Sequence, residues 1–429
     1  MNEYDSNYLS LQFSKNGYSE ADIPEDADIV IINTCSVREK AEQKAFSMLG
    51  RMIKLKKKKP DLVLGFMGCI AQQEGELLLK KYPDLNIVIG TREVSEVTKI
   101  LERVISFNER ICLTDLSVLP VYSTGSSKEL LKGRIKSHLS IMEGCNNFCS
   151  YCIVPYVRGR EVSRAPEEIL NEAGNLVDAG VMEITLLGQN VNSYASGSKE
   201  KVDFPDLLSM IAGIKGLKRL RFTTSHPKDL SDRLINAFKE IDILCPHIHL
   251  PFQSGSNRIL KLMNRKYTIE EYVDLVLKLR EFDPLFAITS DVIVGFPGES
   301  EDDFKKTLDL ITKIEFDNLF SFKYSDRKGT KAAALPDAEK IDEKKKAYRL
   351  KELQDLQKEK TLVRNKMLEG KTVEILVDGV SKRGDQYSGR TGSNKIINFK
   401  SNIDMIGELV NVTVKRSFIN SLQGEIPNK

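Results

Sequence analysis

Short apolar runs rich in valine and isoleucine alternate with longer helix-compatible stretches along most of this 429-residue chain. In its first part the runs fall at 28–34 (DIVIINT), 62–68 (LVLGFMG) and 86–90 (NIVIG), and helix-compatible stretches at 37–58 and 72–81 separate them. Strands that alternate with helices form βαβ units, and these build a parallel sheet. The sequence therefore predicts an α/β fold whose first domain spans residues 1–125, with a Ser/Thr/Gly-containing linker at 122–128.

The same alternation continues on a larger scale in a second predicted domain, residues 130–336. Candidate strands lie at 137–142, 183–187, 219–224, 247–252, 288–294 and 319–324. Helical segments such as 165–179, 268–281 and 300–314 lie between them. Six βα repeats are typical of a barrel or partial barrel, in which chemistry takes place at the C-terminal ends of the strands.

Residues 337–370 are charged and favour helix, so we expect them to form a connecting helix. Short strands at 373–377, 395–399 and 409–414, with a turn signal at Arg383-Gly384-Asp385, predict a small β-barrel over 371–429, of a kind that binds nucleic acid. Residues 361–429 carry 11 basic and 7 acidic residues, whereas the whole chain has a net charge of only +3. This concentration of positive charge indicates a polyanionic partner.

Composition excludes several other classes of protein. With 41% hydrophobic and 29% charged residues, the chain is typical of folded globular proteins. No apolar run approaches the about 18–20 residues that cross a bilayer. The first residues, MNEYDS, contain neither a basic nor an apolar signal segment. We therefore expect a cytoplasmic protein with no membrane partner.

Three of the seven cysteines stand within eight residues, directly after a predicted strand. Cys145, Cys149 and Cys152 form a C-x3-C-x2-C pattern, and no fourth cysteine or histidine is close in sequence. A structural zinc ion needs four ligands, so a closed zinc site fits poorly. Thiolates also bind iron–sulfur clusters, and three thiolates on a four-iron cluster leave one iron open for a substrate or cofactor.

This pattern, with Tyr151 before its last cysteine, resembles that of the radical S-adenosylmethionine (SAM) superfamily. The strings INTCSVREKAEQKA, GCIAQQEG, HIHLPFQSGSNRILKLMNRKYT and SDVIVGFPGE resemble those of the methylthiotransferases, most closely the MiaB-type tRNA enzymes. The C-terminal module is similar to the OB-like TRAM RNA-binding domain. The resemblance covers essentially the whole chain and implies a central partial (βα)6 radical-SAM barrel.

The resemblance also implies a reaction. The open iron of the cluster on Cys145, Cys149 and Cys152 would chelate SAM, and reductive cleavage of SAM would yield a 5′-deoxyadenosyl radical. This radical would activate C2 of the isopentenylated adenosine beside the tRNA anticodon for methylthiolation. An unpaired base in an anticodon loop can be splayed out into a barrel mouth. An electron donor such as flavodoxin or ferredoxin is implied, and we expect a monomer.

A second, auxiliary 4Fe-4S cluster is implied on three N-terminal cysteines, of which Cys35 and Cys69 match the second and third. The first belongs to a Gly-Cys-Gln-Met-Asn-x-x-Asp-Ser string, and the chain starts inside that string at Met1-Asn2. A start codon placed too far downstream would explain its absence. Cys112 falls in a predicted strand, where a buried thiol is the better interpretation.

The remaining candidates carry weaker signals. Tyr151 is implied to lie near the adenine of the cofactor, while Gln189 and Asp291 follow or end predicted strands and are candidates for contact with the cofactor or the substrate, or for turns. His247 and His249 alternate, so both face one side of their strand, where polar contacts inside a barrel are the favoured interpretation.

Cys245 is interpreted as a core thiol. Arg158, Arg160 and Arg164 follow the cysteines closely and are either solvated or anchors for carboxylate or phosphate groups. A short loop beside an anionic cofactor favours the second interpretation.

Two other functions stay open from the sequence. One is a methylthiotransferase that acts on threonylcarbamoyl-adenosine tRNA or on a ribosomal protein aspartate. The other is a non-catalytic tRNA-binding remnant.

Overall fold

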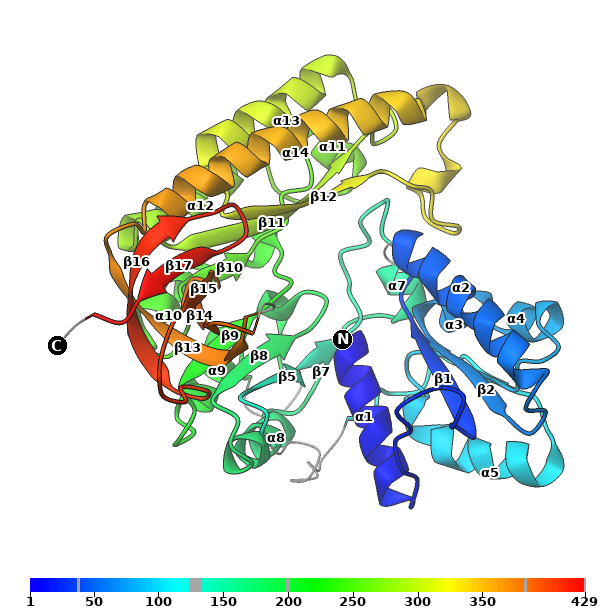
Figure 1. Ribbon diagram of the computed structural model, residues 1–429. Helices are drawn as coiled ribbons and strands as arrows, with labels where there is room; N and C mark the ends of the chain where they lie inside the picture. The colour runs from blue at the N-terminus through cyan, green and yellow to red at the C-terminus, as the bar shows by residue number, and fades with distance from the viewer. Residues whose placement is uncertain (37–38, 123–132, 197–200, 382–383, 428–429) are drawn as a thin grey trace.

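The computed structural model describes residues 1–36, 39–122, 133–196, 201–381 and 384–427. Figure 1 shows an N-terminal α/β sheet, a central half-barrel with helices on its outer face, and a C-terminal β-barrel that nests against the half-barrel. Most of the predicted linker at 122–128 and Arg383 of the predicted turn lie outside the described residues. Within the described residues, no helix combines the length and apolar character needed to cross a membrane.

The N-terminal sheet consists of four parallel strands in chain order: β1 (Ile29–Thr34), β2 (Val63–Gly68), β3 (Ile87–Ile89) and β4 (Ile111–Leu113). Helices cover both of its faces (Figure 1): α1 (Asn2–Lys15), α2 (Glu39–Lys56), α3 (Cys69–Glu74), α4 (Glu76–Lys81) and α5 (Val97–Phe107). The helix expected at 72–81 is interrupted at Gly75, whose φ of +49° favours glycine. Helix α1 was not predicted from the sequence.

The central half-barrel contains six parallel strands: β5 (Lys136–Ser140), β8 (Glu183–Leu187), β9 (Arg219–Phe222), β10 (His247–His249), β11 (Ala287–Val294) and β12 (Asn318–Lys323). They form two three-stranded sheets, which a parallel bridge between Leu220 and Leu244 joins. Each strand begins within a few residues of its expected position.

Helices on the outer face of the half-barrel close the hydrophobic core. These helices are α8 (Pro166–Asp178), α9 (Phe204–Ala212), α10 (Asp232–Glu240), α11 (Asn257–Leu262), α12 (Ile269–Phe282) and α13 (Glu301–Ile314). Asp203, Thr268 and Ser300 each start a helix with a capping box, which explains why three of these helices begin where they do. On β11, Val292 and Val294 pack into this core, so Thr289 and Asp291 face the concave side.

The connecting helix, α14 (Glu343–Lys366), starts later than position 337 because the Asp342 side chain accepts hydrogen bonds from Lys344 N and Lys345 N and caps it there. After α14 comes a closed barrel of five strands: β13 (Thr372–Val380), β14 (Tyr387–Thr391), β15 (Ile396–Phe399), β16 (Leu409–Ser417) and β17 (Leu422–Glu425). Of these strands, β13, β15 and β16 agree with the sequence prediction, whereas β14 and β17 were not predicted.

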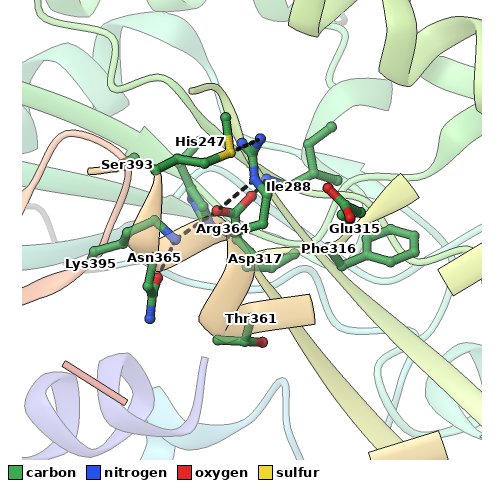
Figure 2. A network of polar contacts seen from close by, with 12 residues as sticks. His247, Ile288, Glu315, Phe316, Asp317, Thr361, Arg364, Asn365, Ser393 and Lys395 are labelled. Carbon is green, nitrogen blue, oxygen red and sulfur yellow. Dashed lines mark hydrogen bonds and ion pairs between the residues drawn. The ribbon is translucent and has the colours of Figure 1, made fainter. Parts of the chain in front are cut away.

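The C-terminal barrel is packed against the N-terminal ends of the half-barrel strands. Arg221 on β9 donates to the carbonyl oxygens of Thr391 and Gly392, at 2.7 and 2.6 Å. Figure 2 shows a second junction, in which buried Asp317 accepts from Ile288 N at 2.9 Å and pairs with Lys395 at 2.7 Å and Arg364 at 3.5 Å. The C-terminal barrel therefore covers the concave face of the half-barrel at the N-terminal ends of its strands.

The Asp317 junction generates a stability prediction. Asp317→Asn keeps the shape of the side chain but leaves the buried charges of Arg364 and Lys395 without a carboxylate. Breaking a buried ion pair in this way costs about 3–5 kcal/mol, so we expect a lower urea midpoint in unfolding followed by circular dichroism. The control is Asp355→Asn, whose partners Lys351 and Lys358 are exposed on α14. Equal midpoints for the two variants would contradict the prediction.

Candidate functional site

The three clustered cysteines lie on a loop at the C-terminal end of the first half-barrel strand. The loop follows the short strand β6 (Met142–Glu143), which pairs with β7 (Val162–Ser163), and it leads into the short helix α7 (Val154–Val157). Gly144 starts it with a φ of +78°, and a Cβ there would lie 2.1 Å from the carbonyl oxygen of Arg160. Only glycine fits, because both the backbone conformation and the space exclude a side chain. Gly144 N also donates to Gln189 Oε1, and Cys145 N donates to Gly159 O at 3.2 Å.

A second segment, just after α11, holds the other side of the cysteine loop. Asn264 Nδ2 donates to Phe148 O at 2.9 Å, and Ser150 N donates to Met263 O at 3.0 Å. Arg265 is buried and donates to Cys149 Sγ at 3.5 Å and to Pro251 O at 2.8 Å. These contacts fix the loop to the C-terminal end of the half-barrel.

The environment of the three sulfurs fits a metal cluster. All seven cysteines are free of disulfides. Burial raises the pKa of Cys145 and raises that of Cys152 to about 12, so thiolates there need a compensating positive charge, which bound metal supplies. Hydrogen bonds to sulfur from Asn147 on Cys145 and from Arg265 on Cys149, both at 3.5 Å, favour the anionic form.

Within the described ranges, no three His, Cys, Asp or Glu side chains are close enough to hold one metal ion. Thiolates on a four-iron cluster bind different irons, so they do not converge on one point.

Cys35 and Cys69 lie side by side at the C-terminal edge of the N-terminal sheet. Thr34 ends β1 and is in register with Gly68 at the end of β2, so the two cysteines follow paired positions. Burial is the main cause that raises the pKa of Cys69, and the nearby Arg158 lowers it. Cys112 lies on β4, two strands away from β2, beside Gly75 and Thr114, and burial raises its pKa to about 11.

The expectation that the three arginines anchor external anions is wrong for two of them. Arg158 is buried and pairs with Asp5 at 2.7 Å and with Glu143 at 2.5 Å. Arg164 is also buried and pairs with Glu172 at 2.8 Å. The carboxylates of the chain already occupy these guanidinium groups, whereas Arg160 is exposed and lies over the Phe148 ring at 5.4 Å.

The other sequence candidates take different positions. Tyr151 packs against a small apolar cluster that includes Met263 and Phe296, and burial holds the pKa of its hydroxyl well above the usual range. Gln189 accepts the Gly144 hydrogen bond under the cysteine loop. Cys245 is a buried thiol near Ile243, in agreement with its interpretation as a core residue.

The polar contacts expected for His247 and His249 are confirmed. Both rings approach the Thr289 hydroxyl, His247 Nε2 at 3.2 Å and His249 Nδ1 at 3.1 Å, and His249 Nε2 lies 3.5 Å from Asp291 Oδ2. These side chains stand on the concave face of β10 and β11.

Two important residues were missed by the sequence analysis. Arg265 stands in the NRKYT end of a string that carried the resemblance, but its sequence spacing gives no sign that it reaches Cys149. Phe320 on β12 contacts the His249 ring, with the ring centroids 5.8 Å apart. Only the order of the strands brings these pairs together.

Three family models match the chain in an order that follows its architecture. Residues 1–90 match the family described as uncharacterized protein family UPF0004, residues 139–311 match the radical SAM superfamily, and residues 366–426 match the TRAM domain. The chain is thus a radical SAM protein with a TRAM domain, and its half-barrel and closed C-terminal barrel agree with this class.

Curated relatives identify the family more narrowly. A tRNA-2-methylthio-N(6)-dimethylallyladenosine synthase of Syntrophus aciditrophicus is 50% identical, over 99% of this chain and 92% of its own length. One of the same name from Syntrophobacter fumaroxidans is 46% identical, over 99% and 93% of the two chains. The chain belongs to the family of these tRNA-2-methylthio-N(6)-dimethylallyladenosine synthases.

Solved structures with similar folds are more distant in sequence. The radical SAM methyltransferase TsrM of Kitasatospora setae, with cobalamin and a [4Fe-4S] cluster bound, has a TM-score of 0.59 at 14% identity and covers 77% of this chain and 74% of its own. At this identity the likeness shows the fold alone, and it supports the half-barrel.

The Arg158 contacts generate a second prediction. Arg158→Met leaves the buried carboxylate of Glu143 and the partly buried carboxylate of Asp5 without their cation, so we expect a loss of stability of about 3–5 kcal/mol in urea unfolding. Arg160→Met removes the same charge from the same loop at an exposed position and serves as the control. If both variants unfold at the same urea concentration, the Arg158 pairs do not stabilise the fold as argued.

Proposed function

We propose that this protein converts N6-dimethylallyladenosine in tRNA to its 2-methylthio derivative. The observation that carries the proposal is the near full-length identity of 50% to a relative named for this activity, together with the three-cysteine loop at the mouth of the half-barrel. C2 of adenine is an unactivated aromatic carbon, so acid–base groups alone do not remove its hydrogen, and a cofactor must supply the difficult step.

Cys145, Cys149 and Cys152 would hold a 4Fe-4S cluster with SAM, which together supply radical chemistry when bound. Tyr151 and Gln189 are proposed to contact the cofactor, and Asp291 is proposed to contact the cofactor or the substrate. Two positions support this set: Gln189 lies directly under the cysteine loop, and Tyr151 lies within it. Arg265 would hold the Cys149 sulfur in place from the opposite side.

Cys35 and Cys69 would hold an auxiliary 4Fe-4S cluster together with a third ligand. Support comes from their adjacent positions at the ends of β1 and β2. Cys35 and Arg158 also lie close enough to Cys69 to shift the pKa of its thiol. Arg158 belongs to the chain segment that follows the other three cysteines, so this pair lies next to their loop.

The remaining parts of the proposal concern organisation and partners. Functional units are proposed at 1–125, 130–336, 337–370 and 371–429, with the last one binding tRNA. A flavodoxin or ferredoxin would donate electrons. The protein would act as a monomer in the cytoplasm.

The activity can be tested in cells that lack their own tRNA methylthiotransferase. Expression of the coding sequence, together with any upstream codons that supply the third auxiliary ligand, should restore 2-methylthio-N6-dimethylallyladenosine in nucleoside mass spectra. Cys149→Ala in the same sequence should abolish the product because one of three cluster thiolates is lost. Cys245→Ala removes a buried thiol outside the loop and should retain the product. A methylthiolated threonylcarbamoyl-adenosine would support the first alternative function, and no modified nucleoside would support the non-catalytic one.

Exposed basic residues on the C-terminal barrel generate a prediction for tRNA binding. Replacing Lys371, Lys400 and Arg416 with Gln should weaken tRNA binding. The slope of the logarithm of the binding constant against the logarithm of the salt concentration should become shallower by about 0.7–0.9 for each lost phosphate contact. The matched control replaces Lys54, Lys57 and Lys58, which are exposed near the end of α2, and should leave the slope unchanged. Fluorescence anisotropy over a salt series measures both. Identical slopes for the two triple variants would show that this barrel does not bind the backbone.

A further inference from the structure

One aromatic ring stands exposed on the concave face of the half-barrel. On β12, Leu319 packs outward into the core, so its neighbour Phe320 points to the concave side. Phe320 is 43% exposed, although an apolar ring of this size gains free energy from burial. An aromatic surface that is left accessible inside a polar barrel is a candidate contact for a ligand.

Polar side chains surround this ring at the same level of the barrel. The strand register places His249 beside Thr289 and Asp291 beside Phe320. The His249 ring meets Phe320 edge-on, at an interplanar angle of 71°. Thr289 and Asp291 hold its two nitrogens from one strand, so the imidazole is fixed in orientation. Three adjacent strands thus build one wall.

The wall lies between the cysteine loop and the C-terminal barrel. His249 precedes Pro251 by two residues, and Pro251 O accepts a hydrogen bond from Arg265, which also donates to Cys149. At a rise of about 3.3 Å per residue, His249 lies about 7 Å deeper along the strand than this contact. His247 lies two residues before His249, closer to the C-terminal barrel. Burial lowers the pKa of His247, and the positive charges of Lys395 and Arg390 in that barrel help to lower it.

We propose that Phe320 and His249 form the binding wall for the dimethylallylated adenine. This inference rests on the proposed function and names the contact surface for its substrate. The apolar dimethylallyl group and the base pack against Phe320, whose ring the edge-on His249 imidazole supports. Asp291 adds specificity, because its carboxylate repels an anionic N6 substituent such as threonylcarbamoyl.

The test measures steady-state methylthiolation of an anticodon stem-loop RNA with and without the N6-dimethylallyl group. Phe320→Ala should raise KM for the dimethylallylated RNA about 5- to 100-fold, and Phe320→Trp should keep it near the wild-type value because stacking is retained. SAM cleavage in the absence of RNA should be unchanged in both variants. Phe282→Ala, which truncates an exposed ring on α12, is the matched control.

Equilibrium binding separates this inference from the proposed function. Anisotropy titrations give the Kd of the dimethylallylated and of the unmodified stem-loop. The wild type should bind the dimethylallylated RNA more tightly, and Phe320→Ala should bind the two RNAs equally. That result supports the binding wall even if no methylthiolation is detected, in which case only the proposed function fails. A KM within twofold of wild type for Phe320→Ala, or a preference that survives the substitution, would overturn the inference. Equal melting temperatures show that the variants are folded.

Discussion

The concave face of the half-barrel is lined with ionisable side chains, and a buried charge needs a partner. Arg219, Arg221 and His247 stand at its deep end, where water is largely excluded. Glu183 pairs with Arg221, and carbonyl oxygens of the C-terminal barrel accept the remaining hydrogen bonds. This requirement holds the C-terminal barrel against the half-barrel. The C-terminal barrel is therefore a closed sheet of its own that also covers one end of the half-barrel (Figure 1).

The junction at Asp317 shows the same requirement on the connecting helix. Arg364 and Asn365 sit at the end of α14, and Lys395 comes from the C-terminal barrel, yet all three meet near one carboxylate (Figure 2). Ion pairs with well-placed hydrogen bonds fix orientation even where their net stabilisation is modest. A barrel held in this way keeps a constant orientation relative to the half-barrel.

At the opposite end, Arg158 connects the N-terminal sheet to the three-cysteine loop. Asp5 comes from α1, Glu143 from β6 and Cys69 from the start of α3, and all of them approach this one buried guanidinium. Its contacts hold the two cysteine sites next to each other. For a reaction that draws on both sites, this fixed spacing is a precondition, because geometry that is set in advance lowers the entropic cost of bringing groups together.

Local patterns in the sequence were enough to define the parts of the protein. Apolar runs located the six half-barrel strands, and the stretches between them located helices such as α12 and α13, because hydrophobic periodicity acts over a few residues. The spacing of Cys145, Cys149 and Cys152 pointed to a cluster for the same reason. Short elements without strong periodicity, such as β14 and β17, were missed.

The tertiary structure alone decided which parts meet. From the sequence, Arg158 was expected to bind an external anion. In the folded protein it forms ion pairs with Asp5 and Glu143 instead. Arg265 reaches Cys149 across 116 positions, and Phe320 reaches His249 across three strands. Such contacts depend on the order and register of the strands. The free energy of folding that favours one order and register comes from packing of the whole core, so no local segment determines it. The sequence by itself therefore determined the elements and the cysteine motif, and the long-range packing decided the site.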